Sequence, residues 1–176
     1  ALMVRAPRVP LALRPLTAQA FAPFGQVIDT QSAVQRVAIN AGTCQRHHDL
    51  GRPSADGGAL AFNLFVADAV ACPAPLRLME RHHLGSQSFA PFGAALRMVI
   101  VVAAPTLDAA ALAPEHLHGF ITDGHQGINL NPGVWHHPLL ALDAGPWLVV
   151  DRVGAPGEAP DCEVVDISPW HLQTTG

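Results

Sequence analysis

The sequence predicts an all-β protein with little helix, built as a barrel or a sandwich. Many short apolar segments recur at fairly regular spacing, and several of them alternate polar with apolar side chains. The segments between them are rich in turn formers, with 15 glycines and 16 prolines in the chain. A length of 176 residues favours one domain. We therefore expect residues 1–176 to form a single β domain with an extended N-terminal arm (1–15) and a C-terminal tail (168–176).

The expected elements can be placed in chain order. Thr17 is a suitable N-cap for a short helix that ends at Phe21. The predicted strands are 26–28, 35–40, 59–66, 76–82, 96–103, 119–122, 127–130, 147–152 and 162–167. The segment 96–103 is the strongest because it is rich in β-branched residues and has no interruption. The segment 108–112 predicts one or two helical turns, and Asp123-Gly124 predicts a hairpin turn.

Composition excludes several classes of function. All ten Lys and Arg residues are arginines, so a Schiff-base lysine and lysine-bound pyridoxal phosphate are excluded, and we expect no organic cofactor. The net charge of -4 and the lack of a basic stripe argue against a nucleic-acid partner. No apolar run approaches the ~20 residues of a membrane helix, so no membrane partner is expected. Cys44, Cys72 and Cys162 are widely spaced, which predicts reduced, buried thiols in a cytoplasmic protein.

Two polar clusters indicate an active site. Residues 80–89 and 132–139 each combine imidazole, amide or charged groups with a glycine turn, beside a predicted strand. Imidazole is the commonest neutral metal ligand and a proton carrier near neutral pH. Clusters on two separate strands can converge into one polar pocket inside an apolar barrel. The pattern therefore predicts an enzyme.

Strand geometry limits which of these side chains act together. Successive side chains alternate between the faces of a sheet, so Glu80 and His82 share one face while Arg81 points to the other. His136 and His137 likewise cannot both face the pocket on a regular strand. We favour His136, because the chain after His137 continues into Pro138 and a turn.

Five motifs of the chain resemble the ureidoglycolate lyase family. They lie at 46–50, 80–91, 120–129, 133–139 and 149–152. The resemblance implies a cupin-like fold, the jelly-roll or double-stranded β-helix barrel, and a homodimer in the cytoplasm. It also implies cleavage of ureidoglycolate to glyoxylate and urea, in allantoin and purine catabolism. In the wider cupin group, His82, Gln87 and His136 fall near metal-ligand positions, so a divalent metal such as nickel is a further implication.

The implied reaction assigns catalytic roles. Ureidoglycolate is a hemiaminal, and its cleavage requires removal of the hydroxyl proton and protonation of the leaving nitrogen. A general base with a pKa near neutrality suits the first step. His82 and His136 are the candidates for this role or for metal ligation, and Glu80 is a second candidate base.

Four further residues are predicted to bind the substrate: Arg81, Gln87, Asn129 and Trp135. The planar guanidinium of Arg81 suits a carboxylate, which it can bind through two parallel hydrogen bonds. Gln87 and Asn129 offer neutral amides to the urea group. Trp135 is expected in the core or in the wall of the pocket.

The chain departs from the family pattern at two places. His83 replaces a proline, and we expect it to be incidental to catalysis. Asn131-Pro132 replaces a His-Arg pair, which predicts altered contacts to the substrate if that pair takes part in binding.

The same sequence features are compatible with other functions. Glu80, His82 and His136 would also suit another cupin metalloenzyme, an isomerase or dioxygenase acting on a small hydroxy or keto acid. A non-catalytic ligand sensor is less favoured, since the chain has no room for a second domain. Residues 47–49 are expected either in a solvated loop or over the pocket, and Asp151-Arg152 is expected to form a structural ion pair.

Overall fold

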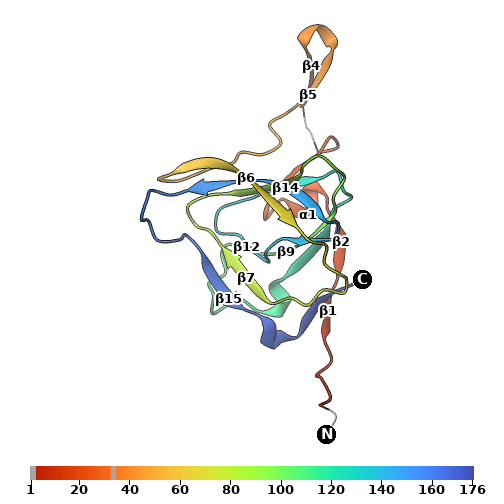
Figure 1. Ribbon diagram of the computed structural model, residues 1–176, viewed down its shortest axis with the longest axis vertical. Helices are drawn as coiled ribbons and strands as arrows, with labels where there is room; N and C mark the ends of the chain where they lie inside the picture. Colours follow the sequence, from red (N-terminus) through yellow and green to blue (C-terminus); the bar gives the residue numbers. More distant parts are fainter. Residues whose placement is uncertain (1–2, 33–34) are drawn as a thin grey trace.

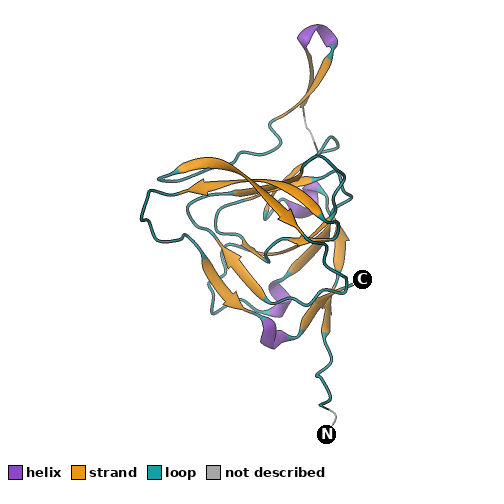
Figure 2. Cartoon of the chain, viewed as in Figure 1, coloured by secondary structure: helices purple, strands orange, loops and turns teal. Residues whose placement is uncertain are grey.

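The structure, a computed structural model, describes residues 3–32 and 35–176, so residues 1 and 2 of the predicted N-terminal arm lie outside the described residues. The fold is all-β, as predicted, and Figure 2 shows strands and loops with only short helical segments. One sheet contains, in spatial order, β15 (Glu163–Asp166), β7 (Leu78–Arg81), β12 (Trp135–His136), β9 (Met98–Ala103), β10 (His118–Ile121) and β2 (Leu13–Pro15), with β13 (Leu140–Ala141) also paired to β9.

A second sheet faces the first one and closes the barrel. Its strands are, in order, β3 (Gly25–Ile28), β11 (Gly127–Leu130), β8 (Gln87–Pro91), β14 (Gly145–Val153) and β6 (Ala59–Ala67). Side chains of both sheets form one hydrophobic cluster, to which β9, β11 and β14 all contribute. The arrangement agrees with the predicted cupin-like barrel.

Strand β9 explains why residues 98–103 of the predicted strand 96–103 are apolar without alternation, whereas Arg97 lies before β9 and is exposed. Met98, Ile100 and Val102 belong to the cluster between the two sheets. Val99 and Val101 point the other way, into a second cluster behind the first sheet. All six residues of β9 are buried. A strand that is buried on both faces needs apolar side chains at every position.

Two small sheets lie outside the barrel. The strands β1 (Val9–Leu11) and β16 (Leu172–Thr174) pair in parallel, so the predicted arm and the predicted tail meet. The strands β4 (Gln35–Ile39) and β5 (Cys44–His48) form a hairpin that extends away from the body (Figure 1). His47 and His48, for which a solvated loop was one of two expectations, therefore lie in a strand.

The helical segments are short. Helix α1 (Ala18–Phe21) begins where predicted, and the Thr17 hydroxyl accepts a hydrogen bond from the Ala20 N–H. Three 3-10 turns follow, at η1 (Asn40–Gly42), η2 (Pro114–His116) and η3 (Ser168–Trp170). The segment 108–112 forms only a hydrogen-bonded turn, since its residues are not helical. None of the helices among the described residues is long and apolar enough to span a membrane.

The predicted hairpin at Asp123-Gly124 is wrong. Strand β10 before the turn pairs with β9 and β2, whereas β11 after it pairs with β3 and β8. The segment between them carries the chain from one sheet to the other. Gly124 has a positive φ of 97°, and the Asp123 carboxylate accepts the His125 N–H at 2.8 Å. The residues that favour a hairpin therefore make a crossing turn instead.

Candidate active site

Adjacent strands β7 and β12 place three polar side chains together inside the barrel. His136 lies directly opposite Glu80 in the antiparallel pairing of these strands. Glu80 and His82 are two positions apart and point to the same side, as alternation predicts. One ligand atom of each of Glu80, His82 and His136 lies within 4.8 Å of the others. We call these three residues the triad.

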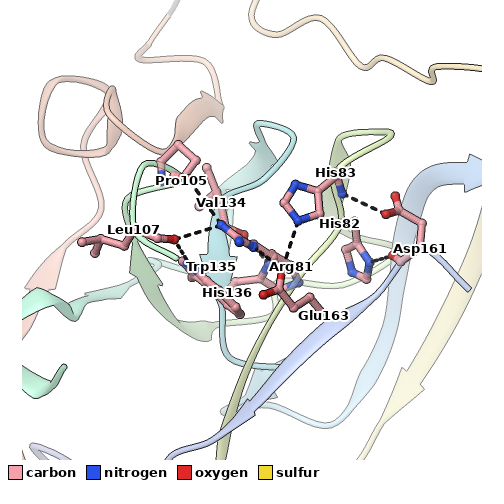
Figure 3. Close-up of polar contacts among 10 residues, drawn as sticks. All are labelled: Arg81, His82, His83, Pro105, Leu107, Val134, Trp135, His136, Asp161 and Glu163. Carbon is pink, nitrogen blue, oxygen red and sulfur yellow. Dashed lines mark hydrogen bonds and ion pairs between the residues drawn. The ribbon is translucent and has the colours of Figure 1, made fainter. Parts of the chain in front are cut away.

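Backbone carbonyls fix both imidazoles of the triad. His82 Nδ1 lies 2.7 Å from the Asp161 carbonyl oxygen, and His136 Nδ1 lies 3.0 Å from the Val134 carbonyl oxygen (Figure 3). A carbonyl only accepts hydrogen bonds, so each Nδ1 carries the proton and each Nε2 keeps a lone pair. Both Nε2 atoms are buried and have no hydrogen-bond partner among the described residues. The two rings lie 5.3 Å apart between centroids.

The atoms of the triad that face one another are all hydrogen-bond acceptors: the Nε2 atoms of His82 and His136 and the Glu80 carboxylate oxygens. The Glu80 carboxylate lies 3.5 Å from His136 Nε2. When His136 Nε2 carries a proton, the hydrogen bond that it donates lowers the pKa of Glu80 in spite of the partial burial of the carboxyl group. A carboxylate and two imidazole lone pairs in one buried place need a proton or a metal cation among them. The donor set fits a divalent metal, because two imidazoles and a carboxylate are common ligands of such ions.

The opposite faces of the same strands carry Arg81 and Trp135. The Arg81 side chain is buried, and its Nε donates to the Glu163 carboxylate at 2.8 Å. Its Nη1 donates to the Leu107 carbonyl at 2.9 Å, and the guanidinium stacks 4.2 Å above the Trp135 ring (Figure 3). Trp135 Nε1 donates to the same carbonyl. The structure thus places both residues behind the sheet, away from the triad.

The two predicted amide residues lie in the second sheet. Gln87 on β8 donates to the Asp151 carboxylate at 3.1 Å, and its buried Oε1 has no partner among the described residues. The Asn129 amide on β11 donates to the Gln26 side chain at 2.8 Å and accepts from the Ser88 hydroxyl at 2.7 Å. Both amides are held by neighbouring side chains. Their contact with a substrate, and ligation of a metal by Gln87, stay predictions.

Neighbouring residues lie outside the triad. His83 is half exposed and contacts the Glu163 carboxylate at 3.1 Å. His137 Nε2 accepts the Arg77 N–H, and burial lowers the pKa of its imidazole. Asn131, at the departure from the family pattern, accepts a hydrogen bond from the Gln26 amide and lines a separate hollow beside Asp49.

A cavity of about 250 Å³ opens beside His82. Asp151 and Arg152 on β14 line it together with the loop 154–161. The prediction of an ion pair between these two neighbours is wrong, since adjacent side chains of a strand point apart. Asp151 accepts from Asn63 and Gln87, whereas Arg152 pairs with Glu158 at 2.8 Å. The strand-end position of Arg152 was the only sequence signal for its place at the cavity.

Comparison with known proteins places the chain in a family. A model of the ureidoglycolate lyase family matches residues 8–173. The chain belongs to the ureidoglycolate lyase family. A ureidoglycolate lyase of Burkholderia cepacia is 42% identical over 93% of this chain and 90% of its own length. One from Azotobacter vinelandii is 42% identical over 87% of this chain and 89% of its own. One from Brucella ovis is 42% identical over 94% and 95%.

Membership of the ureidoglycolate lyase family makes the chain a lyase. It gives no support to the isomerase or dioxygenase activity that the sequence of Glu80, His82 and His136 would also allow. The family match covers the triad, the cavity and both departures from the pattern, because all of them lie between residues 8 and 173.

Proposed function

We propose that the protein cleaves ureidoglycolate to glyoxylate and urea, with the triad as its reaction centre. The observation that carries the proposal is the pair of buried Nε2 atoms of His82 and His136 beside the Glu80 carboxylate, which have no hydrogen-bond partner among the described residues. These atoms can accept a proton from a substrate hydroxyl without breaking a bond within the protein. Membership of the family supports the choice of substrate.

The reaction transfers one proton from the hydroxyl oxygen to the leaving nitrogen and breaks the C–N bond. The hydroxyl proton of the hemiaminal passes to an Nε2 lone pair, and the electrons of the O–H bond form the aldehyde carbonyl. The C–N bond breaks, and the ureido nitrogen takes up a proton and leaves as urea. The carbonyls of Asp161 and Val134 hold each ring so that only Nε2 faces the reaction. A positioned proton transfer of this kind is worth roughly 10²–10⁴-fold in rate.

A divalent metal would be held by the same triad. His82, His136 and Glu80 are the residues that would bind it, and nickel is the ion that we propose. When bound, such an ion supplies Lewis acidity toward the substrate hydroxyl. The Nδ1 hydrogen bonds of both histidines are the usual outer contacts of metal-binding imidazoles, since they orient the ring and fix its tautomer.

Turnover of racemic ureidoglycolate by the purified protein tests this function. We expect glyoxylate and urea in equal amounts and no ammonia. Chelator treatment should lower the rate, and added nickel should restore it, because a metal would balance the three acceptors of the triad. Release of ammonia would indicate an amidohydrolase instead, and no turnover with or without nickel would refute the proposed substrate.

We further propose that the protein is a cytoplasmic homodimer. Strand β6 is the last strand of its sheet, and it exposes Phe62 and Val66 at 79% and 81%. A long apolar edge strand invites pairing with another chain. The three cysteines are free thiols, which suits a reducing compartment, although the prediction that they are buried is wrong, since Cys44 and Cys162 are exposed. Light scattering after size exclusion should give twice the chain mass for the native protein and a monomer for Phe62→Glu. A native monomer would contradict the dimer.

A further inference from the structure

The cavity beside His82 is lined by Arg152, which takes no part in the proton transfer proposed above. The Arg152 side chain is only 9% exposed, although it lines a cavity. Its Nε donates to the Asp56 carbonyl at 2.6 Å, and its Nη2 donates to the Gly57 carbonyl at 3.3 Å. These bonds hold the guanidinium in place from the loop before β6.

Glycines make room for this arginine. A Cβ at Gly85 would lie 2.9 Å from the Arg152 Cβ and 3.0 Å from the Ser54 carbonyl oxygen. A Cβ at Gly58 would lie 3.0 Å from the Arg152 Nε. Both contacts are closer than side chains normally allow, so the backbone approaches Arg152 where only glycine fits. The position of the guanidinium is thus fixed from several sides.

The partner of Arg152 is a carboxylate of the protein itself. Glu158 accepts from Arg152 Nη2 with both oxygens, at 2.8 Å and 3.1 Å. Glu158 lies in the loop after β14, where residues 155–160 are exposed, and its own side chain is 33% exposed. A fixed, nearly buried cation is therefore covered by an acid from an exposed loop.

The two other acids of the cavity are already satisfied. Asp151 accepts from the Asn63 and Gln87 amides. Asp161 accepts the backbone N–H groups of His83 and Leu84. Of the three carboxylates, Glu158 alone has the Arg152 guanidinium as its partner. If a ligand carboxylate replaced Glu158 on the guanidinium of Arg152, the arginine would still be paired with one negative charge.

We propose that Arg152 binds the carboxylate of an α-hydroxy acid substrate, and that this carboxylate replaces Glu158 on the guanidinium. The inference rests on the proposed function, because it places the substrate between Arg152 and His82 in one cavity. It also assigns the carboxylate to a different residue from Arg81. The guanidinium of Arg81 already has Glu163 and Leu107 as partners on the far side of β7.

Binding of glycolate and of its neutral amide, glycolamide, tests the proposal without turnover. By calorimetry, we expect the native protein to bind glycolate more tightly than glycolamide. Arg152→Gln should weaken glycolate at least about tenfold, since charge-assisted hydrogen bonds are lost. Glu158→Gln should tighten glycolate roughly threefold or more, because the competing internal carboxylate becomes neutral. Glycolamide should respond little to either change.

The matched control is Arg97→Gln. It removes an arginine from a partly exposed ion pair with Asp143, and neither residue lines the cavity. It should leave glycolate binding unchanged. Unchanged or weaker glycolate binding in Glu158→Gln would overturn the exchange, even if Arg152→Gln failed to fold. In turnover, Arg152→Gln should raise KM for ureidoglycolate more than it lowers kcat. A native protein that binds glycolate through Arg152 yet fails to cleave ureidoglycolate would refute the proposed function and leave this subsite standing.

Discussion

His136→Ala is expected to lower turnover of ureidoglycolate by about 100-fold or more, with the fold intact. The substitution removes one of the two Nε2 acceptors, and with it the imidazole that lies 3.5 Å from the Glu80 carboxylate. Metal uptake, measured by calorimetry with nickel, should fall in the same variant, because one of three ligands is lost. Circular dichroism checks that the barrel is formed.

His83→Ala is the matched control, since it removes a nearby imidazole of the same motif outside the triad. Its turnover should stay close to that of the native protein. A folded His136→Ala protein with nearly normal activity would remove His136 from the mechanism. A severe loss in His83→Ala would show that the reaction depends on the other imidazole of the His82-His83 pair.

Trp135→Ala is expected to lower the free energy of unfolding by about 3–5 kcal/mol, the usual cost of removing a buried tryptophan. Trp135 is fully buried, donates to the Leu107 carbonyl and supports the Arg81 guanidinium. Its loss leaves a large cavity and uncovers a buried charge. Urea denaturation followed by circular dichroism measures the change.

The milder pair Trp135→Phe and Trp147→Phe separates packing from polar contacts. Both indoles are fully buried, but Trp147 Nε1 has no hydrogen-bond partner among the described residues, whereas Trp135 Nε1 has one. Trp135→Phe should therefore cost more stability than Trp147→Phe. Equal costs would mean that the hydrogen bond and the arginine contact of Trp135 add nothing measurable.

Local patterns predicted the parts of the fold that local physics decides. The cap at Thr17, the buried strand at 98–103 and the alternation of Glu80 with Arg81 all follow from side-chain chemistry and strand periodicity. Alternation also allowed only one of His136 and His137 to face the pocket, and the turn that begins at Pro138 favoured His136. These features need no knowledge of which strands are neighbours.

The predicted hairpin was wrong because strand pairing depends on segments that are distant in sequence. Asp123-Gly124 has the composition of a hairpin turn, but the hydrogen-bond partners of the flanking strands come from elsewhere in the chain. The role of Arg152 was missed for a different reason, because its partner Glu158 is only six residues away but lies in an irregular loop. Its sequence neighbour Asp151 looked like its partner, and only the folded loop brings Glu158 beside it. A strand-end charge has to be interpreted with the loops that close over it.

The double burial of β9 ties the two hydrophobic clusters into one cooperative unit. Because consecutive side chains of this strand belong to different clusters, neither cluster can become disordered without removing the partners of the other. Strand β12, which carries His136, pairs directly with β9. The reaction centre is therefore attached to a strand that is buried on both faces and resists local opening, whereas the loop that carries Glu158 is exposed.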